Sequence, residues 1–267
     1  MASLQDDLSL SQELADLADS ITLRHFRSEG LVVETKPDMT PVSEADREVE
    51  QAVRDQLTRA RPDDVVVGEE FGSSGGAPDA SSGGRRWIID PIDGTKGYVR
   101  GVPVWATLLA LDQGDGPSVG IISAPALRRR WWAARGHGAY VSDGLSAGPR
   151  RIEVSGVREL GDAMLSFGDL EDWSAVGRLD SLLELARRCW RTRGLGDFWS
   201  YMLVAEGAAE IAVDPVVSVW DMAASQVIVE EAGGRQTDLS GASRPDGGSG
   251  LATNGLLHDV ALSILGH

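Results

Sequence analysis

Cysteine is almost absent from this sequence: one residue, Cys189, occurs among 267. A single cysteine cannot form a disulfide within the chain, so folding does not depend on an oxidising compartment. We interpret Cys189 as a small core residue, which is a common role of an unpaired cysteine. The cysteine content therefore fits a reducing cytoplasm.

Positive charge is also scarce. Lysine and arginine together number 25, against 41 aspartates and glutamates, and the formal net charge is -16 at pH 7. Nucleic acids and anionic lipid surfaces carry charge of the same sign and are disfavoured as partners of such a protein. The composition therefore predicts no nucleic-acid partner and no membrane partner.

Long hydrophobic runs are missing as well. The most apolar uncharged windows cover residues 102–111 and 116–127, and both are shorter than the roughly 18 apolar residues that a membrane-spanning helix needs. Residues 1–7 lack the positive start and the apolar stretch of a signal peptide. We therefore expect a cytoplasmic protein.

Two catalytic signatures are absent too. The four histidines show no zinc-binding spacing, and no Gly-x-x-x-x-Gly-Lys phosphate loop occurs. Zinc hydrolases and nucleoside triphosphatases of those types therefore lose support.

The residues that are present have an ordinary globular composition, with 42% hydrophobic and 25% charged residues. Helical spacing of leucines after Ser9 and Gln12, which form a capping-box pattern, predicts a helix that ends before Gly30. A second helix is predicted from Ser43, a suitable N-cap, to the residues before Pro62.

Short apolar runs predict a group of strands in the first half of the chain. The predicted strands are 65–67, 87–89, 105–111, 119–122 and 131–134, and later helices are predicted at 179–186, 202–209 and 221–232. Clustered strands with helices at both ends favour stacked layers of helix and sheet. Residues 72–84 are rich in glycine and serine and predict a mobile surface loop, and a role as a lid is left open.

Acidic residues follow strand-like runs or open a helix at three places. Glu69 follows the first run, Asp90 and Asp93 follow the second, and Asp221 opens the last predicted helix. Carboxylates at strand ends are held by a rigid backbone and are the oxygen ligands that Mg²⁺ prefers. If the fold brings these acids together, a cation is needed to offset their repulsion.

The turn after Asp90 carries a second signal. Pro91 restricts the backbone and Gly94 permits close approach of a ligand, so the amides of Gly94 and Thr95 can cradle a phosphate group. A cation site beside an anion site is typical of metal-assisted phosphoryl transfer to water.

Three segments, Gly-Glu-Glu at 68–70, Asp-Pro-Ile-Asp-Gly-Thr at 90–95 and Trp-Asp-Met-Ala-Ala at 220–224, resemble motifs of the inositol monophosphatase superfamily of Mg²⁺-dependent, lithium-sensitive phosphatases. The resemblance covers nearly the whole chain. It implies an α+β fold, the layered α-β-α-β-α sandwich of the inositol monophosphatase and fructose bisphosphatase type. It also implies a homodimer and a single phosphatase unit over residues 1–267, with a division into two subdomains near residue 150 left open.

Segments 36–46, 131–136, 196–201 and 252–255 are similar to the histidinol-phosphate phosphatases of actinobacteria. This finer similarity implies hydrolysis of a small phosphorylated metabolite, L-histidinol phosphate, to L-histidinol and phosphate in histidine biosynthesis. The enzyme alternative is a phosphatase of inositol-1-phosphate or of a broader set of sugar phosphates or nucleotides. The alternative from another class is a catalytically silent relative that binds a metabolite or a partner and regulates it. The intact set of acids and Thr95 disfavour this alternative, because such a protein does not need them.

The resemblance also implies a set of metal ligands. Glu69, Asp90 and the carbonyl of Ile92 would bind one Mg²⁺, while Asp90, Asp93 and Asp221 would bind a second. A weaker third ion would bind near Glu69. The alternatives are that Asp90 and Asp93 are turn residues, that Glu69 is a solvated strand end and that Asp221 is a helix N-cap. Because all four acids occur within the family's motifs, we do not expect all of these alternatives to hold together.

A catalytic pair is implied in the same way. Thr95 would orient the attacking water, and Asp46 would take a proton from the Thr95 hydroxyl. Asp46 as a first-turn acid that complements the helix dipole, and Thr95 as a cap, stay open as alternatives.

Histidinol phosphate carries a protonated amine and an imidazole, so a selective pocket should present carboxylates away from the metals. Asp197 and Asp214 are the candidates, because the resemblance places both segments beside the non-phosphate part of the substrate. Gly94, Thr95 and Gly196 would complete the substrate site. The alternatives are that Asp197 caps a helix and that Asp214 begins a turn.

Overall fold

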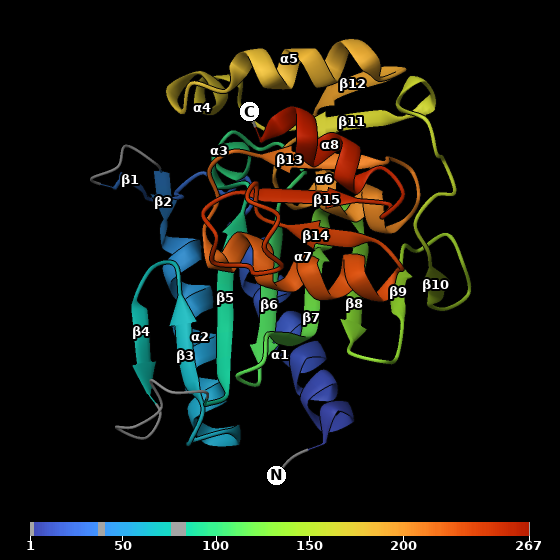
Figure 1. Cartoon of the computed structure of the whole chain (residues 1–267). Helices are drawn as coiled ribbons and strands as arrows, with labels where there is room; N and C mark the ends of the chain where they lie inside the picture. Colours follow the sequence, from blue (N-terminus) through green and yellow to red (C-terminus); the bar gives the residue numbers. More distant parts are fainter. Residues whose placement is uncertain (1–2, 37–40, 76–83, 267) are drawn as a thin grey trace.

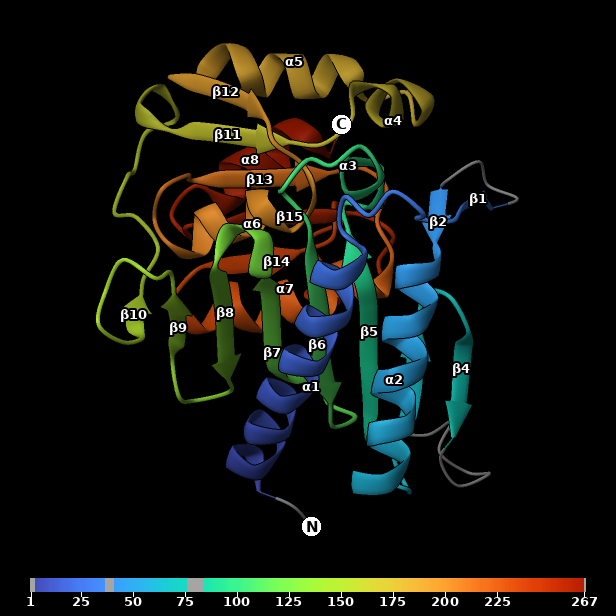
Figure 2. The same cartoon turned by 180° about the vertical axis from the view of Figure 1, so that it is seen from behind.

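Two stacked β-sheets, with helices between them and on both outer faces, organise the chain (Figures 1 and 2). The computed structural model describes residues 3–36, 41–75 and 84–266. Within these residues, no helix is long and apolar enough to cross a membrane.

The larger sheet has eight strands in the order β10-β9-β8-β7-β6-β5-β3-β4. They are β3 (Val65–Gly68), β4 (Gly72–Gly75), β5 (Arg86–Asp93), β6 (Ala106–Asp112), β7 (Pro117–Ala124), β8 (Arg129–Ala134), β9 (Ala139–Ser142) and β10 (Arg150–Ile152). β3 and β5 run parallel, and the other neighbours run antiparallel. The apolar runs predicted as strands all lie in this sheet, and those predictions are confirmed.

The glycine- and serine-rich segment 72–84 differs in part from the predicted loop. Residues 72–75 form β4, which pairs with β3 at the edge of the larger sheet. Arg54 holds this strand by donating to the Gly72 carbonyl and the Ser74 hydroxyl. Residues 76–83 lie outside the described residues, so a role as a lid stays a prediction.

Two helices, α1 (Leu4–His25) and α2 (Glu44–Ala60), cover one face of the larger sheet (Figure 2). The hairpin of β1 (Val33–Thr35) and β2 (Pro41–Ser43) connects them. Helix α2 begins after Ser43 as predicted. The predicted start of α1 at Ser9 is wrong, because Ser3 and Asp6 form an earlier capping box with the same chemistry.

The middle layer consists of α6 (Asp197–Ala205) and α7 (Val219–Glu231). α7 packs against β6 and β7 on one side and against β14 (Arg235–Thr237) and β15 (Gly250–Thr253) on the other. Its Ala223, Ala224, Val227 and Ile228 are all buried, as a helix between two sheets requires. The α6 helix begins five residues before the predicted position 202, directly after Gly196.

The smaller sheet has the strand order β12-β11-β13-β15-β14. Its other strands are β11 (Met164–Phe167), β12 (Arg191–Gly194) and β13 (Ile211–Asp214). The outer face of this sheet is covered by α4 (Leu170–Ala175), α5 (Leu179–Arg188) and α8 (His258–Leu265). A short helix, α3 (Thr95–Val99), follows β5 of the larger sheet. The helices therefore alternate with the sheets in the predicted α-β-α-β-α order, and the α+β layered fold is confirmed.

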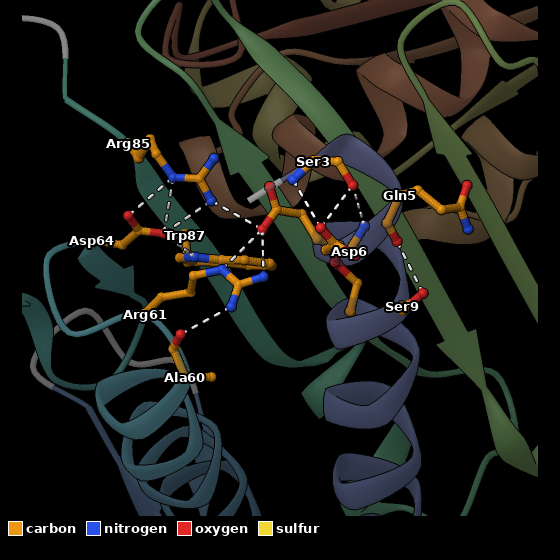
Figure 3. A network of polar contacts seen from close by, with 11 residues as sticks. Ser3, Gln5, Asp6, Ser9, Ala60, Arg61, Asp64, Arg85 and Trp87 are labelled. Atoms are coloured by element: carbon orange, nitrogen blue, oxygen red, sulfur yellow. Dashed lines mark hydrogen bonds and ion pairs between the residues drawn. The ribbon is translucent and has the colours of Figure 1, made fainter. Parts of the chain in front are cut away.

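A buried ion network fixes the start of α1 against the larger sheet (Figure 3). The side chain of Asp7 is fully buried and accepts from Arg61, which follows α2, and from Arg85, which precedes β5. Arg85 also pairs with Asp64, whose carboxylate accepts the indole N–H of Trp87 at 2.9 Å. Buried ion pairs of this kind are costly to break, because the remaining charge has no solvent.

Candidate active site

A cleft of about 790 Å³ opens where β3 and β5 of the larger sheet end, beside α6 and the smaller sheet. The predicted site residues that line it are Glu69, Asp90, Ile92, Asp93, Gly94, Thr95, Gly196, Asp197, Asp214 and Asp221. Asp46 lies behind this surface and reaches the cleft through Thr95. The fold thus brings together groups that are far apart in the sequence.

The end of β5 is irregular in a way that aims its acids into the cleft. Pairing with β6 shifts register between Asp90 and Asp93, as at a β-bulge, which redirects side chains. The Pro91 carbonyl accepts from the Thr107 hydroxyl at 2.7 Å, while Ile92 is fully buried. Both carboxylates therefore stand on a rigid, packed segment.

Asp90, Asp93 and Asp221 form a tight group, in which one carboxylate oxygen of each residue lies within 4.8 Å of the other two. Asp221 is the third residue of α7, where its carboxylate accepts from the backbone N–H of Ser218 at 2.6 Å. Burial, followed by neighbouring negative charges, raises the pKa of Asp90 and Asp93 well above the usual range. Burial likewise raises the pKa of Asp221 to about 7.

These residues fit a divalent cation. Oδ1 of Asp90 is buried and has no hydrogen-bond partner among the described residues, although a buried carboxylate oxygen normally has one. A hard cation would bind this oxygen and offset the repulsion within the group, and all its ligands would be oxygens, as Mg²⁺ prefers. We call Glu69, Asp90, Asp93 and Asp221 the cation end of the cleft.

Glu69 belongs to this end, although it stands slightly apart from the other acids. Its charge is the largest coulombic contribution that raises the pKa of Asp90. Its Oε1 pairs with Nζ of Lys36 at 2.7 Å, and Lys36 also pairs with Glu70 at 2.5 Å. Lys36 lies in a motif segment but was assigned no role from the sequence.

Thr95 and Asp46 are in contact. The Thr95 hydroxyl lies 2.8 Å from the carbonyl oxygen of Ile92 and 3.4 Å from Oδ1 of Asp46. The other oxygen of Asp46 accepts from the amide and the hydroxyl of Ser43 in the capping box of α2. Asp46 is therefore a helix-start acid and a neighbour of Thr95 at once, and burial raises its pKa.

Asp197 lies beside Gly94, and after burial its negative charge is the largest contribution that raises the pKa of Asp93. A Cβ on Gly94 would come within 3.2 Å of Oδ2 of Asp197, and Gly94 has a φ of +86°. Gly196 is the residue before α6 and Asp197 its first residue, with no side-chain cap bond, so the cap role considered for Asp197 is wrong. Asp197 itself has a φ of +49°, which aspartate tolerates better than most residues.

Asp214 ends β13 and is held by two donors. The buried Tyr201 hydroxyl donates to its Oδ2 at 2.8 Å, and the backbone N–H of Gly168 also donates to the carboxylate. Burial is the main cause that raises the pKa of Asp214 to about 6. A Cβ on Gly168 would lie 2.3 Å from Oδ1 of Asp214, so any larger residue here would displace that carboxylate.

Asp169 and Asp172 also line the cleft and were missed. Asp169 lies two residues after the end of β11 and is the N-cap of α4, and Asp172 is the third residue of that helix. We call Asp169, Asp172, Asp197 and Asp214 the distal end of the cleft. Lys96 is the one basic residue among the described residues that line it.

Comparison with known proteins defines the class. A model of the inositol monophosphatase family matches residues 3–264, and the chain belongs to this family. Among curated relatives, the histidinol-phosphatase of Mycobacterium tuberculosis is 56% identical over 97% of this chain and 98% of its own. The histidinol-phosphatase of Streptomyces coelicolor is 52% identical over 99% of this chain and 98% of its own.

A solved structure supports the fold assignment. An IMPase of Thermotoga maritima superimposes with a TM-score of 0.82 at 30% identity, over 97% of this chain and 96% of its own.

Proposed function

We propose that this chain is a phosphoric monoester hydrolase that converts L-histidinol phosphate and water to L-histidinol and phosphate, a step in histidine biosynthesis. The observation that carries this proposal is the identity of 52% and 56%, over nearly the full length, to two histidinol-phosphatases. The histidinol-phosphatase of Chlorobaculum parvum is 39% identical over 92% of this chain.

The cation end would hold two to three Mg²⁺ ions through Glu69, Asp90, Asp93 and Asp221, together with the carbonyl of Ile92. When bound, Mg²⁺ supplies charge stabilisation for the phosphoryl group and lowers the pKa of water. The unpartnered oxygen of Asp90 and the mutual repulsion of these acids support the assignment.

Thr95 would orient the attacking water, and Asp46 would accept the proton that leaves the Thr95 hydroxyl. In this arrangement the Thr95 hydroxyl accepts a hydrogen bond from the water and passes its own proton toward Oδ1 of Asp46, 3.4 Å away. Gly94 and Thr95 line the cleft beside these groups and would bind the phosphate with their backbone amides.

The distal end would select the leaving group. Four aspartates there favour a substrate with a protonated amine, because charge-assisted hydrogen bonds to carboxylates are strong. Leu170 and Val216, which also line the cleft, keep 47% and 55% of their surface exposed and would contact the carbon skeleton and the imidazole.

Hydrolysis of inositol-1-phosphate is the second candidate. The inositol-1-monophosphatase of Rhizobium meliloti is 33% identical over 81% of this chain, which is lower than the identity to the histidinol-phosphatases. We also propose a homodimer in the cytoplasm and sensitivity to lithium. A division into two subdomains near residue 150 stays a prediction. A LiCl-soaked inhibitory complex is known for a staphylococcal inositol monophosphatase of the same fold.

Phosphate release by the purified protein with Mg²⁺ tests the proposal. L-histidinol phosphate and inositol-1-phosphate are compared at matched concentrations, with Asp90→Asn as the blank. We expect a higher kcat/KM for L-histidinol phosphate. A preference for inositol-1-phosphate would reject the substrate assignment, and no Asp90-dependent release from either would reject both.

A further inference from the structure

Glu50 is a charged side chain buried outside the cleft. It lies on α2, one turn after Asp46, and is 0% exposed. Glutamate is almost never fully buried unless its charge is paired. Here Oε1 of Glu50 accepts from Nε of Arg54 at 2.8 Å and from Nη2 at 2.6 Å.

The same carboxylate binds the backbone of the turn that carries Glu69. Oε2 of Glu50 accepts from the N–H of Glu70 at 2.7 Å, and Oε1 accepts from the N–H of Phe71 at 3.1 Å. The N–H of Glu69 itself bonds to the carbonyl of Ile89 in β5 at 3.3 Å. The backbone is thus fixed at three consecutive amides, with Glu69 at the first.

Gly68 makes this contact possible. A Cβ at Gly68 would lie 2.1 Å from Oε1 of Glu50, so any side chain there would displace the carboxylate. Arg54 extends the clamp to the far limb of the turn through the Gly72 carbonyl and the Ser74 hydroxyl. Glu50 and Arg54 therefore tie β3, β4 and the intervening turn to α2.

The turn needs such support, because it places the negatively charged Glu69 beside the other acids of the cation end. The negative charge of Glu69 lies near those of Asp90 and Asp221 and repels them. The single positive charge of Lys36 is shared by Glu69 and Glu70 and so offsets only part of the negative charge on this turn. Without an anchor, repulsion favours a turn that swings Glu69 away from the cleft. Binding a cation would then require the turn to be ordered again, at a cost in affinity.

We propose that Glu50 is a positioning residue that, with Arg54, holds the turn at 69–71 so that Glu69 faces the cation end and raises its affinity for Mg²⁺. This inference rests on the proposed role of Glu69 as a cation ligand. Glu50 touches neither substrate nor cation, so its effect should appear in metal affinity before it appears in the catalytic rate.

The test is calorimetric titration of the protein with Mg²⁺ alone, without substrate. We expect Glu50→Gln to weaken Mg²⁺ binding by roughly 10–100-fold, the range for loss of an outer partner of a metal ligand. Saturating Mg²⁺ should then restore most of the kcat. Glu69→Gln, measured in the same way, establishes whether Glu69 binds the ion at all.

Asp7→Asn is the matched control, because Asp7 is also a fully buried acid paired with arginine but lies at the start of α1 and does not line the cleft. It should lower the melting temperature and leave Mg²⁺ affinity unchanged. If Glu50→Gln does not fold, Gly68→Ala provides the second test, since its Cβ displaces the Glu50 carboxylate without removing charge.

Two results would overturn the inference, and they have different meanings. If Glu69→Gln weakens Mg²⁺ binding but Glu50→Gln and Gly68→Ala bind it as the wild type does, Glu50 is merely structural and the proposed function stands. If Glu69→Gln itself leaves binding unchanged, the ligand assignment in the proposed function fails, and the role of Glu50 fails with it.

Discussion

The cation end of the cleft comes from the larger sheet and the first turn of α7, whereas the distal end comes from the smaller sheet, the start of α4 and the start of α6. Asp90 is 2% exposed, and Glu69, Asp93 and Asp221 are half-buried. At the distal end, Asp169 and Asp172 are exposed, and only Asp214 is buried. The two ends thus differ in burial as well as in origin.

This difference separates chemistry from substrate choice. Groups that bind a cation need fixed geometry, which buried strand ends provide. Three of the four aspartates proposed to select the leaving group, Asp169, Asp172 and Asp197, lie instead at the starts of α4 and α6, and connecting segments of this kind tolerate sequence change. A fold of this kind can keep one reaction and change its substrate by altering the distal end alone.

Loss of a carboxylate from the cation end should produce the largest effect on activity. We expect Asp90→Asn to lower kcat/KM by more than the roughly 10–100-fold that loss of an outer partner costs a metal site. The same change relieves repulsion within the group, so the metal-free protein should melt at a higher temperature. Calorimetric melting with and without Mg²⁺ measures this, and a lower melting temperature of the metal-free variant would contradict the account.

A buried histidine on the smaller-sheet side should make the free energy of unfolding sensitive to acid. His258 at the start of α8 is fully buried between the hydroxyls of Thr237 and Thr253, and burial lowers its pKa to about 4 from 6.5. The folded state therefore binds fewer protons than the unfolded state below pH 6.5, and stability falls as the pH drops from 6.5 to 4.

This shift corresponds to about 3 kcal/mol of unfolding free energy lost by pH 4. Urea denaturation at pH 7 and pH 4 measures it. In His258→Gln the loss on acidification should be smaller by about that amount, whereas the exposed His137→Gln should behave as the wild type does. An equal loss in wild type and His258→Gln would remove His258 from the explanation.

A single methyl group should disturb the distal end alone. Gly168→Ala would place its Cβ 2.3 Å from Oδ1 of Asp214, and overpacking of this kind costs about 1–3 kcal/mol. We expect the displaced carboxylate to raise KM for L-histidinol phosphate by about tenfold, which corresponds to 1.4 kcal/mol. Mg²⁺ affinity should not change, and a change would show that the two ends are coupled.

The sequence allowed the cation end to be predicted more fully than the distal end. Asp90, Asp93 and Asp221 occur beside apolar runs that become β5 and α7, so a local pattern was enough to find them. Asp169 and Asp172 follow β11, whose sequence Met-Leu-Ser-Phe is interrupted by a serine and therefore gives a weaker apolar pattern than the three valines of β3.

Contacts between distant segments could not be predicted. Glu50 binds backbone amides 20 and 21 residues away. Every residue except proline has a backbone amide, so the sequence does not show which amides a buried carboxylate will bind. The Lys36–Glu69 pair likewise joins residues 33 apart. The start of α1 was misplaced for a different reason, since Ser3 and Ser9 offer equivalent capping chemistry.

The most direct test of the divided cleft is the substrate preference of Asp197→Asn. Asparagine keeps the shape of the side chain and tolerates the positive φ of this residue, but it removes the charge. Asp180→Asn on the exposed start of α5 is the control, because it changes the net charge equally. The ratio of kcat/KM for L-histidinol phosphate to that for inositol-1-phosphate is measured for all three proteins.

We expect this ratio to fall about tenfold in Asp197→Asn, or roughly 1.4 kcal/mol, mainly through KM for L-histidinol phosphate. Asp180→Asn should keep the wild-type ratio. If kcat/KM falls equally for both substrates, Asp197 acts on the cation end or the phosphate, and the division of the cleft into a chemical end and a selective end is contradicted.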